Sequence, residues 1–171
     1  DGFSVNLDDR GLAYPPVYKT SSTESVSLDN RIIVKKASDF NNIDSSKEYF
    51  IDGVIDMGSN SIEIPSGGIN ISGYNFEVSK LVSTEDNLNL FVSSLGGSGG
   101  VLIKDIAIEV SGNNSSVYNL ESVDGFGAFE FERVNYNNCT SLGYIDNYRQ
   151  GFESGTGRFG GKPQMELRGV W

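Results

Sequence analysis

The chain has 171 residues, a formal net charge of −10, 21 glycines, one cysteine and no histidine. Because nucleic acids and anionic membranes require a basic protein surface, we expect neither of them as a partner. The lack of histidine excludes a Ser-His-Asp triad and the commonest metal ligand, and one cysteine cannot form an internal disulfide. We expect no metal and no cofactor.

Residues 1–30 differ in composition from the remainder of the chain. They contain Tyr14, Pro15, Pro16 and Tyr18 between polar flanks, followed by a linker rich in serine and threonine. Adjacent prolines favour an extended backbone. We interpret residues 1–30 as an extended N-terminal arm, which is either an attachment segment for a partner protein or an unstructured lead-in.

The second region, residues 31–171, begins with an apolar stretch at 31–35 that is typical of a strand. Residues 37–47 have the composition of a short helical turn. Since solenoid proteins close their ends with a capping element, we expect this turn to cover the first coil of the region.

A short apolar pattern then recurs five times. The copies are residues 49–55, 69–75, 101–107, 129–135 and 165–171. Their reference column is apolar throughout and contains Ile51, Ile71, Ile103, Phe131 and Leu167. An apolar residue also stands two positions before each reference residue, which is the period of a strand with one buried face.

The alternation in each copy is interrupted by one extra residue, two positions after the reference residue. This residue is Gly53, Gly73, Asp105, Arg133 or Gly169 in the five copies. Glycine and aspartate tolerate a left-handed backbone, so each copy predicts a strand, a one-residue corner and a second strand. Arg133 is the exception among these residue types.

Short strands repeated at unequal intervals, with no helical periodicity, indicate a solenoid whose loops vary in length. We therefore predict an all-β, single-stranded parallel β-helix over residues 31–171, with coils about 4.8 Å apart. A β-propeller is the rival fold, but it requires antiparallel hairpins. The sequence ends inside a copy of the repeat, so we expect the natural β-helix to continue beyond it.

Two carboxylates, Glu77 and Glu109, occupy equivalent positions after the reference residue of adjacent copies. If they stack, they form either an acid pair that cleaves glycans or a Ca²⁺ site. The alternative is a pair of solvated side chains that turn apart. The residue after the reference alternates in sign in three copies (Lys104, Glu132 and Arg168), which predicts a ladder of charges across the coils.

The longest interval between copies is rich in aromatic residues and arginine. It contains Tyr144, Tyr148, Arg149, Phe152, Arg158 and Phe159. Such residues are common at interfaces, so this set predicts a surface that contacts sugars or another subunit. Burial beneath a long loop is the alternative. Cys139, near the start of this interval, is expected to be a small buried side chain.

Several runs resemble bacteriophage tail-fibre and tailspike proteins. They are residues 33–40, 49–53, 135–139 and 142–145, and the resemblance covers residues 31–171. It implies a right-handed β-helix of the pectate-lyase type, a homotrimer, and a location on the virion. In that family a preceding segment attaches to other tail proteins, and a distal part binds or cleaves host surface glycans. No catalytic motif of the family is visible.

The sequence therefore predicts a structural virion protein, the proximal β-helix and attachment region of a receptor-binding tail fibre or tailspike. A polysaccharide lyase or glycoside hydrolase on the same scaffold is the first alternative. A secreted or surface β-helix adhesin of a bacterium is the second, because a fold of this kind does not fix the function.

Overall fold

The computed structural model describes residues 30–125, 127–154, 158–160 and 164–168. The proposed arm, with Tyr14, Pro15, Pro16 and Tyr18, lies outside these residues, as does the end of the last repeat copy. Among the described residues, no helix is long and apolar enough to cross a membrane.

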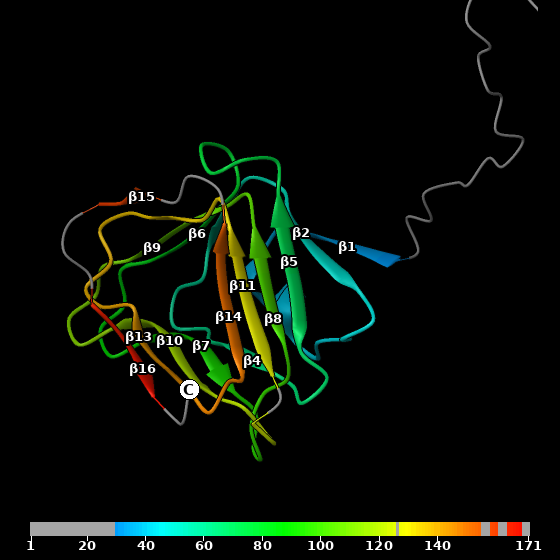
Figure 1. Cartoon of the computed structure of the whole chain (residues 1–171). Coiled ribbons are helices and arrows are strands. Elements are labelled where there is room, and N and C mark those ends of the chain that lie inside the picture. Colours follow the sequence, from blue (N-terminus) through cyan, green and yellow to red (C-terminus); the bar gives the residue numbers. More distant parts are fainter. Residues whose placement is uncertain (1–29, 126, 155–157, 161–163, 169–171) are drawn as a thin grey trace, which may run out of the picture.

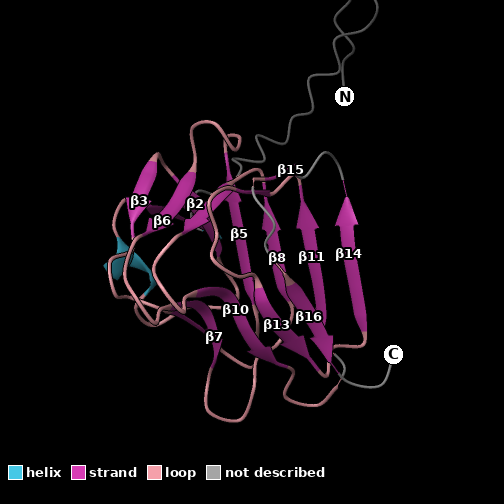
Figure 2. Cartoon of the chain, turned by 90° about the vertical axis from the view of Figure 1, so that its left-hand side faces the viewer, coloured by secondary structure: helices cyan, strands magenta, loops and turns pink. Residues whose placement is uncertain are grey.

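Three parallel sheets enclose one core (Figures 1 and 2). Sheet 1 contains β1 (Arg31–Val34), β2 (Glu48–Ile51), β5 (Ile69–Gly73), β8 (Val101–Lys104), β11 (Ala128–Glu132) and β14 (Gln150–Ser154). Sheet 2 contains β3 (Val54–Asp56), β6 (Lys80–Ser83), β9 (Ala107–Val110), β12 (Asn135–Tyr136) and β15 (Arg158–Phe159). Sheet 3 contains β4 (Ile62–Ile64), β7 (Asn89–Ser93), β10 (Ser116–Glu121), β13 (Gly143–Asp146) and β16 (Met165–Arg168).

From β2 onward, the chain visits the three sheets in a fixed order, one strand in each, and then begins the next coil. Figure 1 shows this progression along sheet 1, where the strands from β2 to β14 lie side by side and point in the same direction. Every strand pair in the described part of the chain is parallel. The prediction of a parallel β-solenoid is thus confirmed, and the propeller is excluded.

The first coil is covered by the 3-10 helix η2 (Ala37–Phe40), as the sequence predicted. The Phe40 ring is buried and stacks on the Tyr49 ring, with 5.6 Å between centroids and 20° between planes. The Asp39 carboxylate accepts hydrogen bonds from the backbone N–H groups of Lys35 and Lys36, at 2.8 and 3.1 Å. These bonds fix the turn that brings Phe40 over the core.

Side chains inside the solenoid stack on equivalent side chains of the next coil. Ile71, Ile103 and Phe131 stand in register on β5, β8 and β11, and all three are buried. The Tyr118 ring stacks on Phe91 of the preceding coil, at 5.4 Å, and on Phe131 across the core, at 5.0 Å. Offset stacking of aromatic rings adds to the hydrophobic free energy of burial.

The register of the first coil differs from the predicted repeat. Tyr49, and not Ile51, is the partner of Ile71 on β5, and Ile51 faces Gly73. Alternation has a period of two residues, so a shift by two preserves the buried face and leaves no trace in the pattern.

The assignment of the last copy was also wrong. β16, which contains Leu167, pairs with β13 in sheet 3, whereas the fifth coil enters sheet 1 through β14. Residues 165–168 have the local pattern of a half-buried strand, and that pattern is common to strands of all three sheets. Only the lengths of the preceding loops decide which sheet such a strand joins.

The predicted corners are left-handed at Gly53, Asp105 and Arg133, with φ of 96°, 58° and 52°. Gly73 does not adopt this conformation. Arg133 tolerates its corner because its guanidinium donates to both oxygens of Asp105 on the coil below, at 2.6 and 2.9 Å. Arg133 also pairs with Glu132.

These corner contacts replace the predicted charge ladder. Lys104 and Glu132 are register partners, but the ion pair across the coils is formed one residue later, by Arg133 and Asp105. Arg168, the third predicted member, belongs to sheet 3.

Close stacking of the coils makes a specific prediction about two glycines. A Cβ atom at Gly112 lies 1.8 Å from the carbonyl oxygen of Glu85 on the preceding coil, whereas one at Gly53 meets nothing within 4 Å. Gly112→Ala forces the coils apart and lowers the free energy of unfolding by about 2 kcal/mol or more. Gly53→Ala lowers the free energy of unfolding by only about 1 kcal/mol, because the only cost is the strain of alanine in a left-handed backbone.

Urea denaturation of the two variants and the wild type measures this difference. Equal losses of stability, or a larger loss for Gly53→Ala, contradict the close approach of the coils at Gly112.

Candidate functional site

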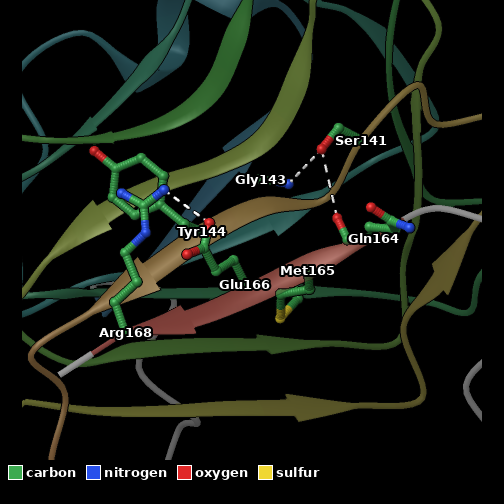
Figure 3. Close-up of a pocket in the computed structure, with 7 residues that line it drawn as sticks. All are labelled: Ser141, Gly143, Tyr144, Gln164, Met165, Glu166 and Arg168. Atoms are coloured by element: carbon green, nitrogen blue, oxygen red, sulfur yellow. Dashed lines mark hydrogen bonds and ion pairs between the residues drawn. The ribbon is translucent and has the colours of Figure 1, made fainter. Parts of the chain in front are cut away.

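A groove on the outer face of sheet 3 is the strongest candidate site. β13 and β16 are neighbours there, with Tyr144 opposite Glu166 and Asp146 opposite Arg168. Side chains alternate along a strand, so these four point outward whereas Ile145 is buried in the core. The groove has a volume of about 560 Å³ and is lined by Ser141, Gly143, Tyr144, Gln164, Met165, Glu166 and Arg168 (Figure 3).

The guanidinium of Arg168 organises this groove. Its Cζ lies 4.0 Å from the centroid of the Tyr144 ring, and its Nη2 donates to Oε2 of Glu166 at 2.8 Å. Figure 3 shows the arginine beside the tyrosine ring, with its head directed toward the carboxylate. A cation over an aromatic face is attracted by the ring quadrupole, so Arg168 is positioned by two neighbours.

The contact between Arg168 and Glu166 also sets the protonation states of these two groups. The hydrogen bond from Arg168 and its positive charge lower the pKa of Glu166, although the carboxyl is exposed to solvent. Hydrogen bonding to Glu166 raises the pKa of Arg168 in turn. Both groups are therefore ionised at neutral pH, and Glu166 is a hydrogen-bond acceptor with no proton to donate.

The other end of the groove is polar and uncharged. The Ser141 hydroxyl accepts from the backbone N–H of Gly143 at 2.9 Å and donates to the carbonyl oxygen of Gln164 at 3.4 Å. The groove thus combines an aromatic ring, a guanidinium, a carboxylate and a polar rim. These groups can hydrogen-bond a ligand that carries several hydroxyls, such as a saccharide.

The predicted stacking of Glu77 over Glu109 does not occur. Glu109 stands opposite Val82 on β6 and forms an ion pair with Lys80 at 3.1 Å. Glu77 lies in the turn after β5, where its N–H donates to Asn75 Oδ1 at 2.8 Å. This turn is an insertion that the alignment of copies did not recognise, so the two carboxylates form neither an acid pair nor a Ca²⁺ site.

No cluster of three or more Cys, Asp and Glu side chains within the described ranges is arranged to hold a metal ion.

The structure places the described members of the predicted set of aromatic residues and arginines in different surroundings, so they do not form one surface. Tyr144 lies in the groove, and Arg149 is exposed. Tyr148 is buried, with its hydroxyl 2.6 Å from Ser98 Oγ and 3.0 Å from the carbonyl oxygen of Gly99, to which it donates. For Tyr148 the alternative of local burial is therefore correct. Phe152 lies in β14, Arg158 and Phe159 lie in β15, and their side chains are outside the described part of the molecule.

Sequence reasoning missed Glu166, Arg168 and Gln164 as site residues. The signal was the pair of alternating segments Tyr144-Ile145-Asp146 and Glu166-Leu167-Arg168, each with an apolar residue between two outward ones. It could have been used only if both strands had been assigned to the same sheet.

Comparison of the chain with protein-family models, with curated proteins and with solved structures found no match.

The only sulfur nucleophile of the chain, Cys139, belongs to the core. Its thiol is buried and lies 3.3 Å from the carbonyl oxygen of Ile108, and burial raises its pKa to about 11. The thiolate fraction at pH 8 is therefore about 100-fold smaller than for an ordinary thiol.

We predict that a disulfide reagent such as Ellman's modifies Cys139 in the native protein at least 100-fold more slowly than in the protein unfolded by guanidinium chloride. Similar rates in the two solvents contradict the buried position.

Proposed function

We propose that this chain is the proximal β-solenoid of a bacteriophage tail fibre or tailspike, a structural component of the virion that binds a host saccharide. The observation that carries the proposal is the groove of Tyr144, Glu166 and Arg168 on the outer face of a stacked solenoid. The proposed assembly is a homotrimer. Residues 1–30 attach it to other tail proteins, and a distal part contributes further contacts to the host glycan.

A stacked solenoid suits this role for a mechanical reason. Each coil packs on the next through buried aliphatic and aromatic side chains. The two ends of the solenoid are therefore held at a fixed distance along its axis. Solenoids also present long, regular outer faces on which ligands bind. The resemblance of residues 31–171 to tail-fibre and tailspike proteins supports the same role.

The chemistry of the groove favours binding of a saccharide over its cleavage. A glycoside hydrolase of the common type needs a protonated carboxylic acid near a second carboxylate. Among the described residues that line the groove, Glu166 is the carboxylate, and Arg168 lowers its pKa. An acid whose pKa is lowered is a poor proton donor at neutral pH. The lyase or hydrolase therefore remains the second candidate.

A matched pair of substitutions tests the saccharide site. Glu166→Gln removes the acceptor charge and releases Arg168, so we expect affinity for the host surface polysaccharide to fall at least about tenfold, which is about 1.4 kcal/mol. Glu63→Gln makes the same change at an exposed carboxylate of the same sheet, on the distant strand β4, and leaves binding unchanged. Binding is measured on immobilised polysaccharides of candidate hosts.

The same polysaccharides, incubated with the protein and assayed for new reducing ends or unsaturated products, test the enzyme alternative. Binding without products supports the proposal. Products that disappear with Glu166→Gln establish the enzyme instead, and binding that is equal in both variants excludes the groove as the saccharide site.

A further inference from the structure

A second exposed surface lies at the opposite end of the solenoid, on the outer face of sheet 1. Ile33 on β1 stands opposite Phe50 on β2, and both point outward. Phe50 packs edge-on against Tyr74, with 4.7 Å between ring centroids and 87° between planes. Tyr74 is 64% exposed and Ile33 is 41% exposed, whereas Phe50 is only 8% exposed because its neighbours cover it. We call Ile33, Phe50 and Tyr74 the aromatic patch.

An arginine holds the patch in a fixed geometry. The Cζ of Arg31 lies 4.7 Å from the centroid of Phe50, and its guanidinium pairs with Glu48 at 2.7 Å. Glu48 also accepts a hydrogen bond from the Ser72 hydroxyl. Burial on its own raises the pKa of Glu48, but these bonds and the nearby charge of Lys104 outweigh it and lower the pKa. Side chains that are ordered beforehand lose less entropy on association, and exposed aromatics with arginine are the usual anchors of protein interfaces.

The charges around the patch identify the kind of partner. β1 and the residue after it carry the cations Arg31 and Lys35, whereas β2 and the residue after it carry the anions Glu48 and Asp52. They form two ion pairs, at 2.7 and 3.5 Å. These four charges therefore balance, and they form two parallel rows of opposite sign. A second copy of the chain presents the same two rows, so each row can face its opposite across the contact.

The charge of the whole chain strengthens this argument. With a net charge of −10, two copies repel each other wherever acidic faces meet. The outer face of sheet 3, with Glu63, Asp146 and Glu166 against Arg168, is such a face. Two copies that meet at the aromatic patch avoid this repulsion, because the charges of the four side chains beside the patch balance.

We propose that the aromatic patch is the surface through which copies of this chain contact one another. The inference rests on the homotrimer of the proposed function and supplies its contact surface. Contact occurs through side chains on the face of the sheet rather than by strand addition at β1. Lys35 and Lys36 immediately after β1 discourage pairing of that edge.

Light scattering coupled to size-exclusion chromatography, on the full chain, tests the surface. We expect the wild type to elute as a trimer and Tyr74→Ser to elute mainly as a monomer. Leu95→Ser removes an apolar side chain that is fully exposed elsewhere, and it keeps the trimer. Circular dichroism confirms that both variants are folded, which is expected because neither side chain is buried.

A charge exchange provides an independent measurement. Lys35→Glu places a third anion beside the patch and dissociates the assembly, whereas Lys35→Glu combined with Asp52→Lys reverses that ion pair, restores two cations and two anions beside the patch, and with them the trimer. If the double variant stays dissociated, the charged side chains of β1 and β2 do not mediate the contact.

The remaining outcomes separate the two proposals. A wild-type trimer that persists in Tyr74→Ser overturns the aromatic patch and leaves the trimeric virion protein intact. A wild type that is monomeric at all concentrations overturns the assembly itself, and the inferred surface with it. Dissociation by Leu95→Ser as well as Tyr74→Ser shows non-specific association and also overturns the inference.

Discussion

The structure depends on the stacking of parallel coils with equivalent residues in register. The inward column Ile71, Ile103 and Phe131 repeats one apolar contact from coil to coil, and Tyr118 extends it between sheets. The same register applies outside the core, where it places Tyr144 beside Glu166 and Ile33 beside Phe50. Both outer surfaces are therefore consequences of the order that packing imposes on the inside.

The sequence predicted the solenoid, its central coils and its capping turn, because these depend on local patterns. Ile71, Ile103 and Phe131 were aligned correctly, and Asp105 occupies a left-handed corner. The first and last coils were misaligned since alternation is unchanged by a shift of two residues or by a move to another sheet. The groove was missed for the same reason. It joins β13 and β16, which are separated in the chain by β14 and β15, and the lengths of the connecting loops have no sequence signal.

The groove and the aromatic patch use the same chemistry for different purposes. In each, an arginine lies over an aromatic ring and is held by a glutamate: Arg168 with Tyr144 and Glu166, and Arg31 with Phe50 and Glu48. The first trio lines a hollow of about 560 Å³ that suits a small polar ligand. The second adjoins the exposed Tyr74 on a sheet face, which suits a protein surface. A fold of this kind does not fix its function, so the proposed role as a receptor-binding assembly depends on these two sites.

The placement of β16 beside β13 is the claim on which the groove depends, and disulfide formation tests it most directly. Neighbouring parallel strands place register partners about 4.8 Å apart, within the Cα range of a disulfide. In a Cys139→Ser background, Tyr144→Cys with Glu166→Cys is expected to crosslink under mild oxidation, whereas Glu130→Cys with Glu166→Cys remains reduced. Crosslinking of the second pair and not the first contradicts the account, because it places residues 165–168 in sheet 1 and removes the groove.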